Sequence, residues 1–237
     1  MDERFSRTSL IYGKEAIERL NKSHVAVFGI GGVGGYVVEA LARSGVGTFT
    51  LIDHDVVSLT NINRQIIATE DTLGKHKVDV MKERILSINP RAVINVKNCF
   101  FLEDNENEFD FTEYDYVVDA IDTVKGKINL IKKCKENNVP IISSMGAGNK
   151  INPMGFIVSD ISKTEMDPLA KVIRQELRKL GINHLKVVYS KEKPLKPQEI
   201  ITDGHKREIP GSNAFVPASC GLLIASEVVK DLIGYED

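Results

Sequence analysis

The sequence contains no tryptophan, has only 3 cysteines among its 237 residues, and lacks any long apolar run. Cys99, Cys134 and Cys220 are too few and too scattered for a disulfide framework or a zinc site of four thiolates. A membrane helix needs roughly 20 consecutive apolar residues, and no segment approaches that length. The charged start at residues 1–4 shows no signal peptide. We therefore expect a soluble, cytoplasmic protein with no membrane partner.

An excess of charge of one sign is also missing, because 31 Lys and Arg stand against 33 Asp and Glu, for a net charge of −2. That balance excludes a uniformly basic nucleic-acid coat, but it leaves room for a local basic patch. What the sequence does have is 42% hydrophobic and 27% charged residues, which is typical of a globular protein. The chain is long enough to bury a substantial core.

Short apolar runs alternate with helical patterns over the first 150 residues. The runs suit strands buried on both faces and lie at 24–29, 48–53, 92–96, 116–120 and 139–144. The helical patterns lie at 14–21, 35–44, 75–88 and 125–137. This alternation predicts right-handed crossovers in an α/β fold of the doubly wound, Rossmann-like kind, with a mostly parallel sheet.

The pattern changes after residue 150. The expected elements there are strands at 155–161 and 185–190, helices at 168–180 and 219–233, and a long exposed loop at 191–213. We predict one domain over 1–237. Its nucleotide-binding core covers 1–150, and a C-terminal extension at 151–237 completes the sheet.

A glycine-rich loop follows the first predicted strand. It contains Gly29, Gly31, Gly32 and Gly34, and a predicted helix begins directly behind it. Glycines let the backbone approach a phosphate closely, and the helix start offers free N–H groups. Asp53 ends the next strand about twenty residues on, where a carboxylate can accept ribose hydroxyls. The loop predicts a nucleotide site, although a tight turn without a ligand has the same local pattern.

Polar residues after the second and fourth strands favour ATP over NAD. Asn61 and Arg64 lie three apart, so one helical turn places both on one face, where they suit a polyphosphate. Lys77 adds a cation. Asp119 and Asp122 end the fourth strand, where a carboxylate can hold Mg²⁺ beside phosphates. Each residue taken singly also suits a helix cap or a solvated charge, and only their combination points to ATP.

Motifs in a fixed order support this interpretation. They are RFSR at 4–7, GIGGVG at 29–34, LID at 51–53, NINRQ at 61–65, GKHK at 74–77 and DAID at 119–122. With them the sequence resembles the ubiquitin-activating-enzyme-like adenylyltransferases of the ThiF and MoeB type. Within that superfamily it most resembles the tRNA threonylcarbamoyladenosine dehydratases, through segments at 42–53, 146–153 and 159–179. That resemblance covers nearly the whole chain.

The resemblance implies roles for individual residues. The glycines Gly29, Gly31, Gly32 and Gly34 would line the ATP phosphates, Asp53 would bind the ribose, Asn61, Arg64 and Lys77 would hold the triphosphate, and Asp122 would lie beside Mg²⁺. Arg7 would reach the ATP of the partner subunit in a homodimer, with an exposed surface arginine as the alternative. Cys220 lies near the catalytic cysteine of related activators, with a buried packing cysteine as the alternative.

The implied chemistry is activation of a carboxylate. The carboxylate attacks the α-phosphate of ATP, and a second nucleophile then displaces AMP from the acyl carbon. In the dehydratases the substrate is threonylcarbamoyladenosine beside the tRNA anticodon, and ring closure removes one water. A monovalent cation and a cysteine-desulfurase or sulfur-acceptor system are candidate further partners.

Two features separate the members of the superfamily. Sulfur-carrier activators usually hold zinc through paired C-x-x-C motifs, and this sequence has none. The segment 163–207 carries 11 Lys and Arg against 6 Asp and Glu, which suits tRNA phosphates as well as a solvated surface. Tyr189 and Phe215 are candidates for stacking on a base or for core packing. Activation of the C-terminal glycine of a ubiquitin-like sulfur carrier and a non-catalytic nucleotide- or NAD-binding module remain the alternative functions.

Overall fold

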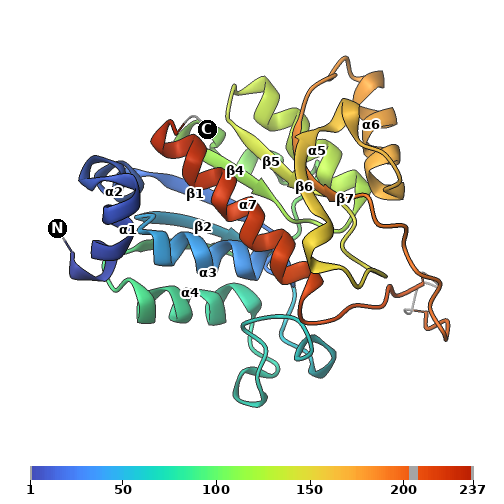
Figure 1. The fold of residues 1–237 in the computed structure, drawn as a ribbon, viewed down its shortest axis with the longest axis horizontal. Coiled ribbons are helices and arrows are strands. Elements are labelled where there is room, and N and C mark those ends of the chain that lie inside the picture. Colours follow the sequence, from blue (N-terminus) through green and yellow to red (C-terminus); the bar gives the residue numbers. More distant parts are fainter. Residues whose placement is uncertain (1, 203–207, 236–237) are drawn as a thin grey trace.

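The computed structural model describes residues 2–202 and 208–235. At its centre is a seven-stranded sheet in the order β3-β2-β1-β4-β5-β7-β6 (Figure 1). The strands are β1 (His24–Phe28), β2 (Thr48–Ile52), β3 (Val93–Lys97), β4 (Tyr116–Asp119), β5 (Ile141–Ser144), β6 (Phe156–Asp160) and β7 (Lys186–Ser190). Every neighbouring pair is parallel except β6 and β7, which are antiparallel. The predicted mostly parallel, doubly wound sheet is confirmed.

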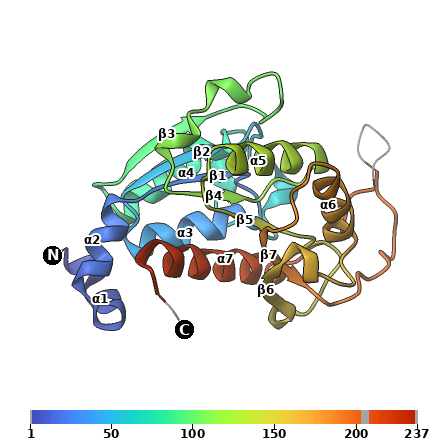
Figure 2. The ribbon, with the colours of Figure 1, turned by 90° about the horizontal axis from the view of Figure 1, so that it is seen from above.

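Seven α-helices of the described residues cover this sheet. They are α1 (Ser6–Tyr12), α2 (Lys14–Lys22), α3 (Gly34–Ser44), α4 (Lys77–Ile88), α5 (Val124–Glu136), α6 (Pro168–Lys179) and α7 (Val216–Ile233). One hydrophobic cluster joins the sheet to α2, α3, α4 and α7, and a second joins its other face to α5 and α6. Figure 2 shows α3 and α7 on one side of the sheet and α5 on the other.

Strand β1 explains why an uninterrupted apolar run is needed at the centre of the sheet. Val25 and Val27 belong to the first cluster, whereas Ala26 and Phe28 belong to the second. Because successive side chains of a strand point to opposite faces, a strand covered on both sides has no polar face. The Phe28 ring lies 5.1 Å from the ring of Phe101, one of several aromatic side chains in the second cluster.

The helix and strand boundaries follow local chemistry. Helix α4 ends at Ile88, directly before Asn89 and the proline at position 90, because the residue before proline avoids helical geometry. Helix α7 begins at Val216, three residues earlier than predicted, since Pro217 is tolerated in a first helical turn that has no partner for its N–H. In the described part of 191–213 the only pairing is an isolated bridge between Thr202 and Glu208.

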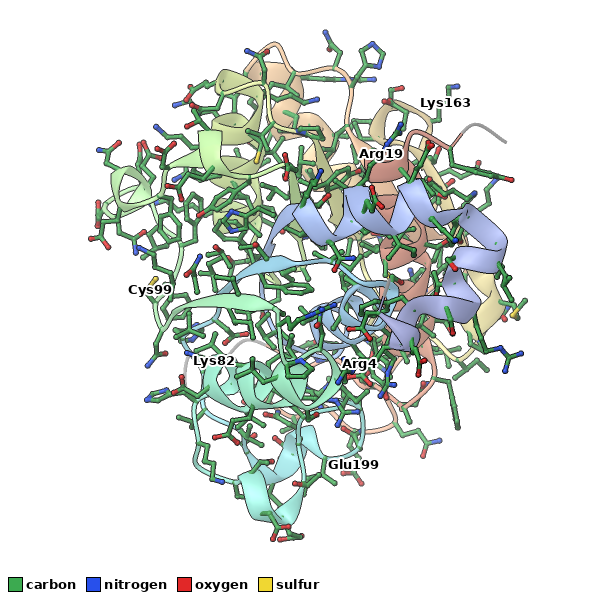
Figure 3. All side chains as sticks on the ribbon, turned by 90° about the vertical axis from the view of Figure 1, so that its left-hand side faces the viewer. Arg4, Arg19, Lys82, Cys99, Lys163 and Glu199 are labelled. Carbon is green, nitrogen blue, oxygen red and sulfur yellow. The ribbon has the colours of Figure 1, made fainter. Side chains whose placement is uncertain are left out.

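The two ends of the chain meet on one side of the sheet. Arg19 of α2, labelled in Figure 3, donates a hydrogen bond of 2.7 Å to the carbonyl oxygen of Ile233, the last residue of α7. A cation at a helix C-terminus offsets the unpaired carbonyls there. Among residues 2–202 and 208–235, no helix combines the length and the apolar character that a membrane crossing requires.

Candidate active site

A cavity of about 850 Å³ opens at the carboxyl ends of the central strands. Its lining includes the residues that directly follow β1, β2, β4 and β5, namely Gly29, Asp53, Ala120 and Met145. In an open α/β sheet this edge is where ligands bind, because the strand order reverses there and the loops diverge. The predicted nucleotide residues therefore meet at the expected place.

The four glycines of the loop do different work. Gly29 has φ of +93°, and a Cβ on it would lie 2.5 Å from the carbonyl oxygen of Ala120. A Cβ on Gly34 would lie 1.8 Å from the carbonyl oxygen of Gly29, so this glycine allows α3 to begin against the strand. Gly31 and Gly32 line the cavity, and Gly34 is outside its lining. Gly29 and Gly34 thus shape the loop, and Gly29, Gly31 and Gly32 line the cavity.

Asp53 fixes the same loop from the end of β2. Its Oδ2 accepts a hydrogen bond of 2.6 Å from the N–H of Ile30, and its Oδ1 accepts one of 2.8 Å from the N–H of Asp55. The side chain is buried yet lines the cavity. A carboxylate oxygen has two lone pairs, so Asp53 can hold the loop and still accept from a ribose hydroxyl.

The NINRQ segment contributes three lining residues. Asn61 accepts from the N–H of Ser58 at 3.1 Å and so also acts as a cap, which was the alternative role considered for it. Arg64 donates to the carbonyl oxygen of Thr60 at 2.8 Å, and its partial burial lowers the pKa of the guanidinium. The Oε1 of Gln65 is buried without a partner in the described structure. An unpaired buried acceptor at a cavity wall suits a bound donor or cation.

Lys77 begins α4 and is buried at the cavity wall. Its Nζ lies 2.6 Å from Oδ2 of Asp55, a residue that the sequence pattern did not single out. The pair holds the ammonium in place, since a buried charge needs a partner. The one feature of the sequence that could have indicated this role is that Asp55 lies two residues after Asp53, just beyond the carboxyl end of β2.

The two aspartates at the end of β4, which the sequence pattern offered together as a carboxylate site for Mg²⁺, lie in different surroundings. Asp119 is fully buried, 3.1 Å from Nζ of Lys127, and accepts from the hydroxyl of Ser143. It is absent from the cavity lining, so it cannot reach Mg²⁺. Asp122 is exposed and lines the cavity. Of the two carboxylates, only Asp122 is open to a metal–phosphate complex, and the orphan Oε1 of Gln65 on the same wall fits such a ligand.

Arg7 and Cys220 lie outside the cavity lining. Arg7 is exposed on α1. Cys220 is fully buried in α7, and burial raises the pKa of its thiol to about 12. A thiol with that pKa stays protonated at neutral pH, whereas nucleophilic cysteines have lowered pKa values. Cys99 does line the cavity, but desolvation raises the pKa of its thiol as well.

The residues predicted to contact RNA differ in their exposure. Tyr189 is 1% exposed and belongs to the core, whereas Phe215, at the start of α7, is 67% exposed. Of the two, only Phe215 is exposed enough to stack on a nucleic-acid base. Core packing, the other role considered for Phe215, does not occur. The exposed cations of the basic segment are Lys163, Lys171, Arg178, Lys179, Lys191, Lys193 and Lys196. Asp203, Lys206 and Arg207 of that segment lie outside the described residues.

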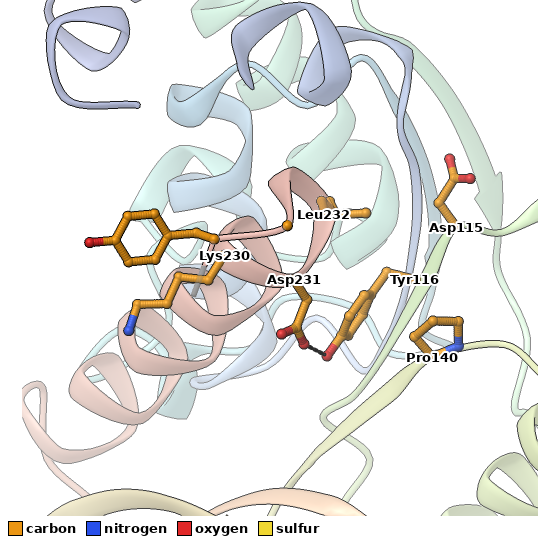
Figure 4. Close-up of a pocket in the computed structure, with 8 residues that line it drawn as sticks. Asp115, Tyr116, Pro140, Lys230, Asp231 and Leu232 are labelled. Atoms are coloured by element: carbon orange, nitrogen blue, oxygen red, sulfur yellow. Dashed lines mark hydrogen bonds between the residues drawn. The ribbon is translucent and has the colours of Figure 1, made fainter. Parts of the chain in front are cut away.

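A second cavity, of about 350 Å³, lies at the opposite edge of the sheet (Figure 4). There the hydroxyl of Tyr116 donates to Oδ2 of Asp231 at 2.6 Å, and burial raises the pKa of Tyr116. The same carboxylate lies 2.8 Å from Nζ of Lys186. These polar groups satisfy one another and join β4 and β7 to the end of α7.

Comparison with known proteins identifies the family. The profile of the ThiF family matches residues 5–237. The chain belongs to the ThiF family. This agrees with the resemblance to adenylyltransferases of the ThiF and MoeB type and with the nucleotide site described above.

Among its relatives, this ThiF-family protein is 45% identical to the tRNA threonylcarbamoyladenosine dehydratase of Bacillus subtilis, over 98% of this chain and 96% of the relative. The Escherichia coli tRNA N6-threonylcarbamoyladenosine dehydratase in complex with AMP has 38% sequence identity and a TM-score of 0.90, covering 98% of this chain and 94% of that one. The same enzyme in complex with ATP has a TM-score of 0.89 at 37% identity and the same coverage. The likeness extends over both chains almost completely.

Proposed function

We propose that this ThiF-family protein is an ATP-dependent tRNA threonylcarbamoyladenosine dehydratase. One observation carries the proposal: the similarity to dehydratases solved with ATP and AMP runs through 98% of the chain. The cavity lined by Gly31, Arg64, Lys77 and Asp122 offers a place for that nucleotide. The missing C-x-x-C motifs also weigh against a zinc-bearing sulfur-carrier activator.

The reaction follows from the weakness of a carboxylate as an electrophile. One oxygen of the threonyl carboxylate attacks the α-phosphorus of ATP, and pyrophosphate leaves with the electrons of the broken P–O bond. A nucleophile of the carbamoyl group then attacks the acyl carbon and loses its proton, while AMP leaves with the carboxylate oxygen. The product is a ring, and the modification has lost one water. Ring closure is favoured because both reacting groups belong to one side chain.

The residues of the chain bind and orient the nucleotide. The backbone at Gly31 and Gly32 faces the phosphates, Asp53 accepts from the ribose, and Asn61 with the paired cations Arg64 and Lys77 holds the triphosphate. Electrostatic stabilisation of the charge that develops on the phosphates is the main contribution of such a site. Asp122 would hold Mg²⁺, which when bound neutralises phosphate charge.

The proposal extends to partners. The exposed cations of 163–196 contact tRNA phosphates, so binding weakens steeply as salt rises. The protein acts as a homodimer in which Arg7 of the partner subunit reaches the ATP. A monovalent cation and a cysteine-desulfurase or sulfur-acceptor system complete the set of expected partners, and the protein works in the cytoplasm.

The decisive experiment is turnover of the modified tRNA. Purified protein, ATP, Mg²⁺ and tRNA bearing threonylcarbamoyladenosine are incubated, and the digested nucleosides are weighed by mass spectrometry. Loss of one water from the modified nucleoside is expected. Unchanged mass under conditions where ATP binding is demonstrated would reject the proposal. Pyrophosphate exchange that depends on a ubiquitin-like carrier would instead indicate a sulfur-carrier activator, and nucleotide binding without either reaction would indicate a non-catalytic module.

A further inference from the structure

One wall of the cavity contains none of the residues assigned to the nucleotide. All seven residues from Ser144 to Lys150 line it. Within this segment the N–H of Met145 donates to Val188 and the N–H of Asn149 donates to Gly211, both at 2.8 Å. The three N–H groups of 146–148 have no acceptor among residues 2–202 and 208–235. Three successive unpaired amides beside a cavity are open to a ligand, since backbone donors are normally satisfied.

A buried lysine sets the direction of one of these amides, that of Ala147. Nζ of Lys150 lies 2.6 Å from the carbonyl oxygen of Gly146, 2.9 Å from Oδ2 of Asp167 and 3.4 Å from the carbonyl oxygen of Ser190. The side chains of Lys150 and Asp167 are 1% and 0% exposed. In a trans peptide the carbonyl and the following N–H point in opposite directions. Because the Gly146 carbonyl points at the buried ammonium, the Ala147 N–H points away from it.

The surroundings hold the segment in this shape. Oδ1 of Asp167 accepts from the N–H of Ala170 at 2.9 Å and so caps α6. A Cβ on Gly146 would lie 3.1 Å from Oδ2 of Asp167, and a Cβ on Gly148 would lie 2.8 Å from Cβ of Pro210. The carbonyl oxygen of Lys150 accepts from Nδ2 of Asn213 at 3.0 Å. The wall is therefore packed against two separate parts of the chain, the start of α6 and the segment 210–213.

We propose that the backbone amides of Gly146, Ala147 and Gly148 receive the anionic carboxyl oxygen of the threonylcarbamoyl substrate, and that Lys150 and Asp167 are positioning residues that hold the peptide between Gly146 and Ala147 in place. This inference rests on the proposed function and adds where the carboxylate of the modified tRNA binds in that site. Amide donors bind a carboxylate through charge-assisted hydrogen bonds, and consecutive backbone N–H groups form anion-binding concavities. The same donors suit the oxyanion that forms when the carbamoyl nucleophile attacks the acyl carbon.

The charge of Lys150 is already compensated by Asp167, so Lys150 is a positioning residue and not a substrate ligand. Its three N–H bonds go to three oxygens of the protein, and Asp167 neutralises it. An ammonium so satisfied has no donor left for the substrate. Lys150 therefore acts through the peptide group of Gly146 and Ala147, to whose carbonyl oxygen it donates.

The test uses full-length protein and an anticodon stem-loop carrying the modification, either as the free carboxylate or as its methyl ester. Wild type should bind the carboxylate form more tightly. Lys150→Met should abolish that preference or lower kcat by about 10²-fold, as expected for the loss of an oxyanion donor, while the Kd for ATP changes less than twofold. Lys22→Met, on the exposed end of α2, is the control with the same change of charge.

The readouts separate the outcomes. A lost preference for the carboxylate assigns the amides to the ground-state anion, and a fall in kcat with an intact preference assigns them to the oxyanion. If neither changes, the inference is overturned. If Lys150→Met fails to fold because Asp167 is left unpaired, the uncharged pair Lys150→Gln with Asp167→Asn carries the same test. Failure of wild type to dehydrate the modified tRNA would reject the proposed function itself, before any variant is compared.

Discussion

The two walls of the cavity present charge in opposite ways. On the nucleotide wall, Arg64 and Asp122 line the cavity, and Lys77 pairs with Asp55, whose side chain is 46% exposed. On the wall at 144–150, Lys150 and Asp167 also belong to the lining, but they pair with each other and their side chains are 1% and 0% exposed, so neither charge is open to a ligand. A triphosphate needs several charges to offset its own, whereas a single carboxylate needs oriented donors.

The largest effect should follow from removing charge at the nucleotide wall. Asp122→Ala is expected to lower the rate of adenylate formation by about 10³-fold or more, because the carboxylate that would hold Mg²⁺, the ion that offsets phosphate charge, is lost. Single-turnover release of pyrophosphate measures it. Asp71→Ala, an exposed aspartate outside the cavity lining, is the control. Full turnover by Asp122→Ala would remove this residue from the magnesium assignment.

A large loss of stability should follow at the second buried pair, below the end of β5. Lys127 donates to Asp119, to Ser143 and to the carbonyl oxygen of Ser144, the first residue of the cavity wall at 144–150. Lys127→Met leaves Asp119 charged and unpaired, so the free energy of unfolding should fall by about 3–5 kcal/mol. Urea denaturation gives the value. The exposed lysine variant Lys14→Met should be near neutral, and equal stability of the two variants would contradict this account.

The glycine loop offers a matched pair of substitutions. Gly34→Ala drives a methyl group into the carbonyl of Gly29 and should destabilise the protein by about 3 kcal/mol. Gly31→Ala meets no atom closer than 3.9 Å, so its stability should change little while ATP binding weakens. Denaturation midpoints and ATP titrations together separate the two roles. Equal loss of stability in both variants would show that the loop shape is not what Gly34 provides.

The smallest effect is expected at Cys220. Because its thiol is buried and protonated at neutral pH, Cys220→Ala should leave kcat within about twofold and cost about 1 kcal/mol of stability, as for a small apolar side chain. Turnover of the modified tRNA and thermal unfolding measure both. A collapse of turnover in a folded variant would restore a catalytic role for this cysteine.

The contrast between the walls also explains what the sequence reveals. The nucleotide wall is built from motifs that each lie within a few residues, such as 29–34 and 61–65, so their chemistry is legible without a structure. The mostly parallel, doubly wound sheet was equally predictable, since short apolar runs alternate with helical patterns along the sequence. The pairing of Lys150 with Asp167 joins residues 17 apart, and that of Lys127 with Asp119 gives no signal of burial. The residue pattern alone therefore does not separate Asp119 from Asp122 as a candidate Mg²⁺ ligand.

Phe215 is a second residue whose surroundings the sequence does not reveal, because it is exposed where a core position was favoured. An aromatic residue beside an apolar helix reads as core, yet the two N–H groups at the start of α7 are capped by Asn213, and the ring points outward. Capping by a residue two positions earlier sets the direction of the chain there. Only tertiary structure shows which face of that first turn the core occupies.

The position of α7 has a consequence for how the protein is made. This helix comes last in the chain, yet a Cβ on its Gly221 would lie 2.4 Å from the carbonyl oxygen of Val33, and Pro217 lies against Gly32 of the nucleotide loop. A nascent chain that has emerged only as far as β7 therefore has a glycine loop with one side uncovered. We therefore expect a chain that lacks α7 to bind ATP more weakly than the full chain.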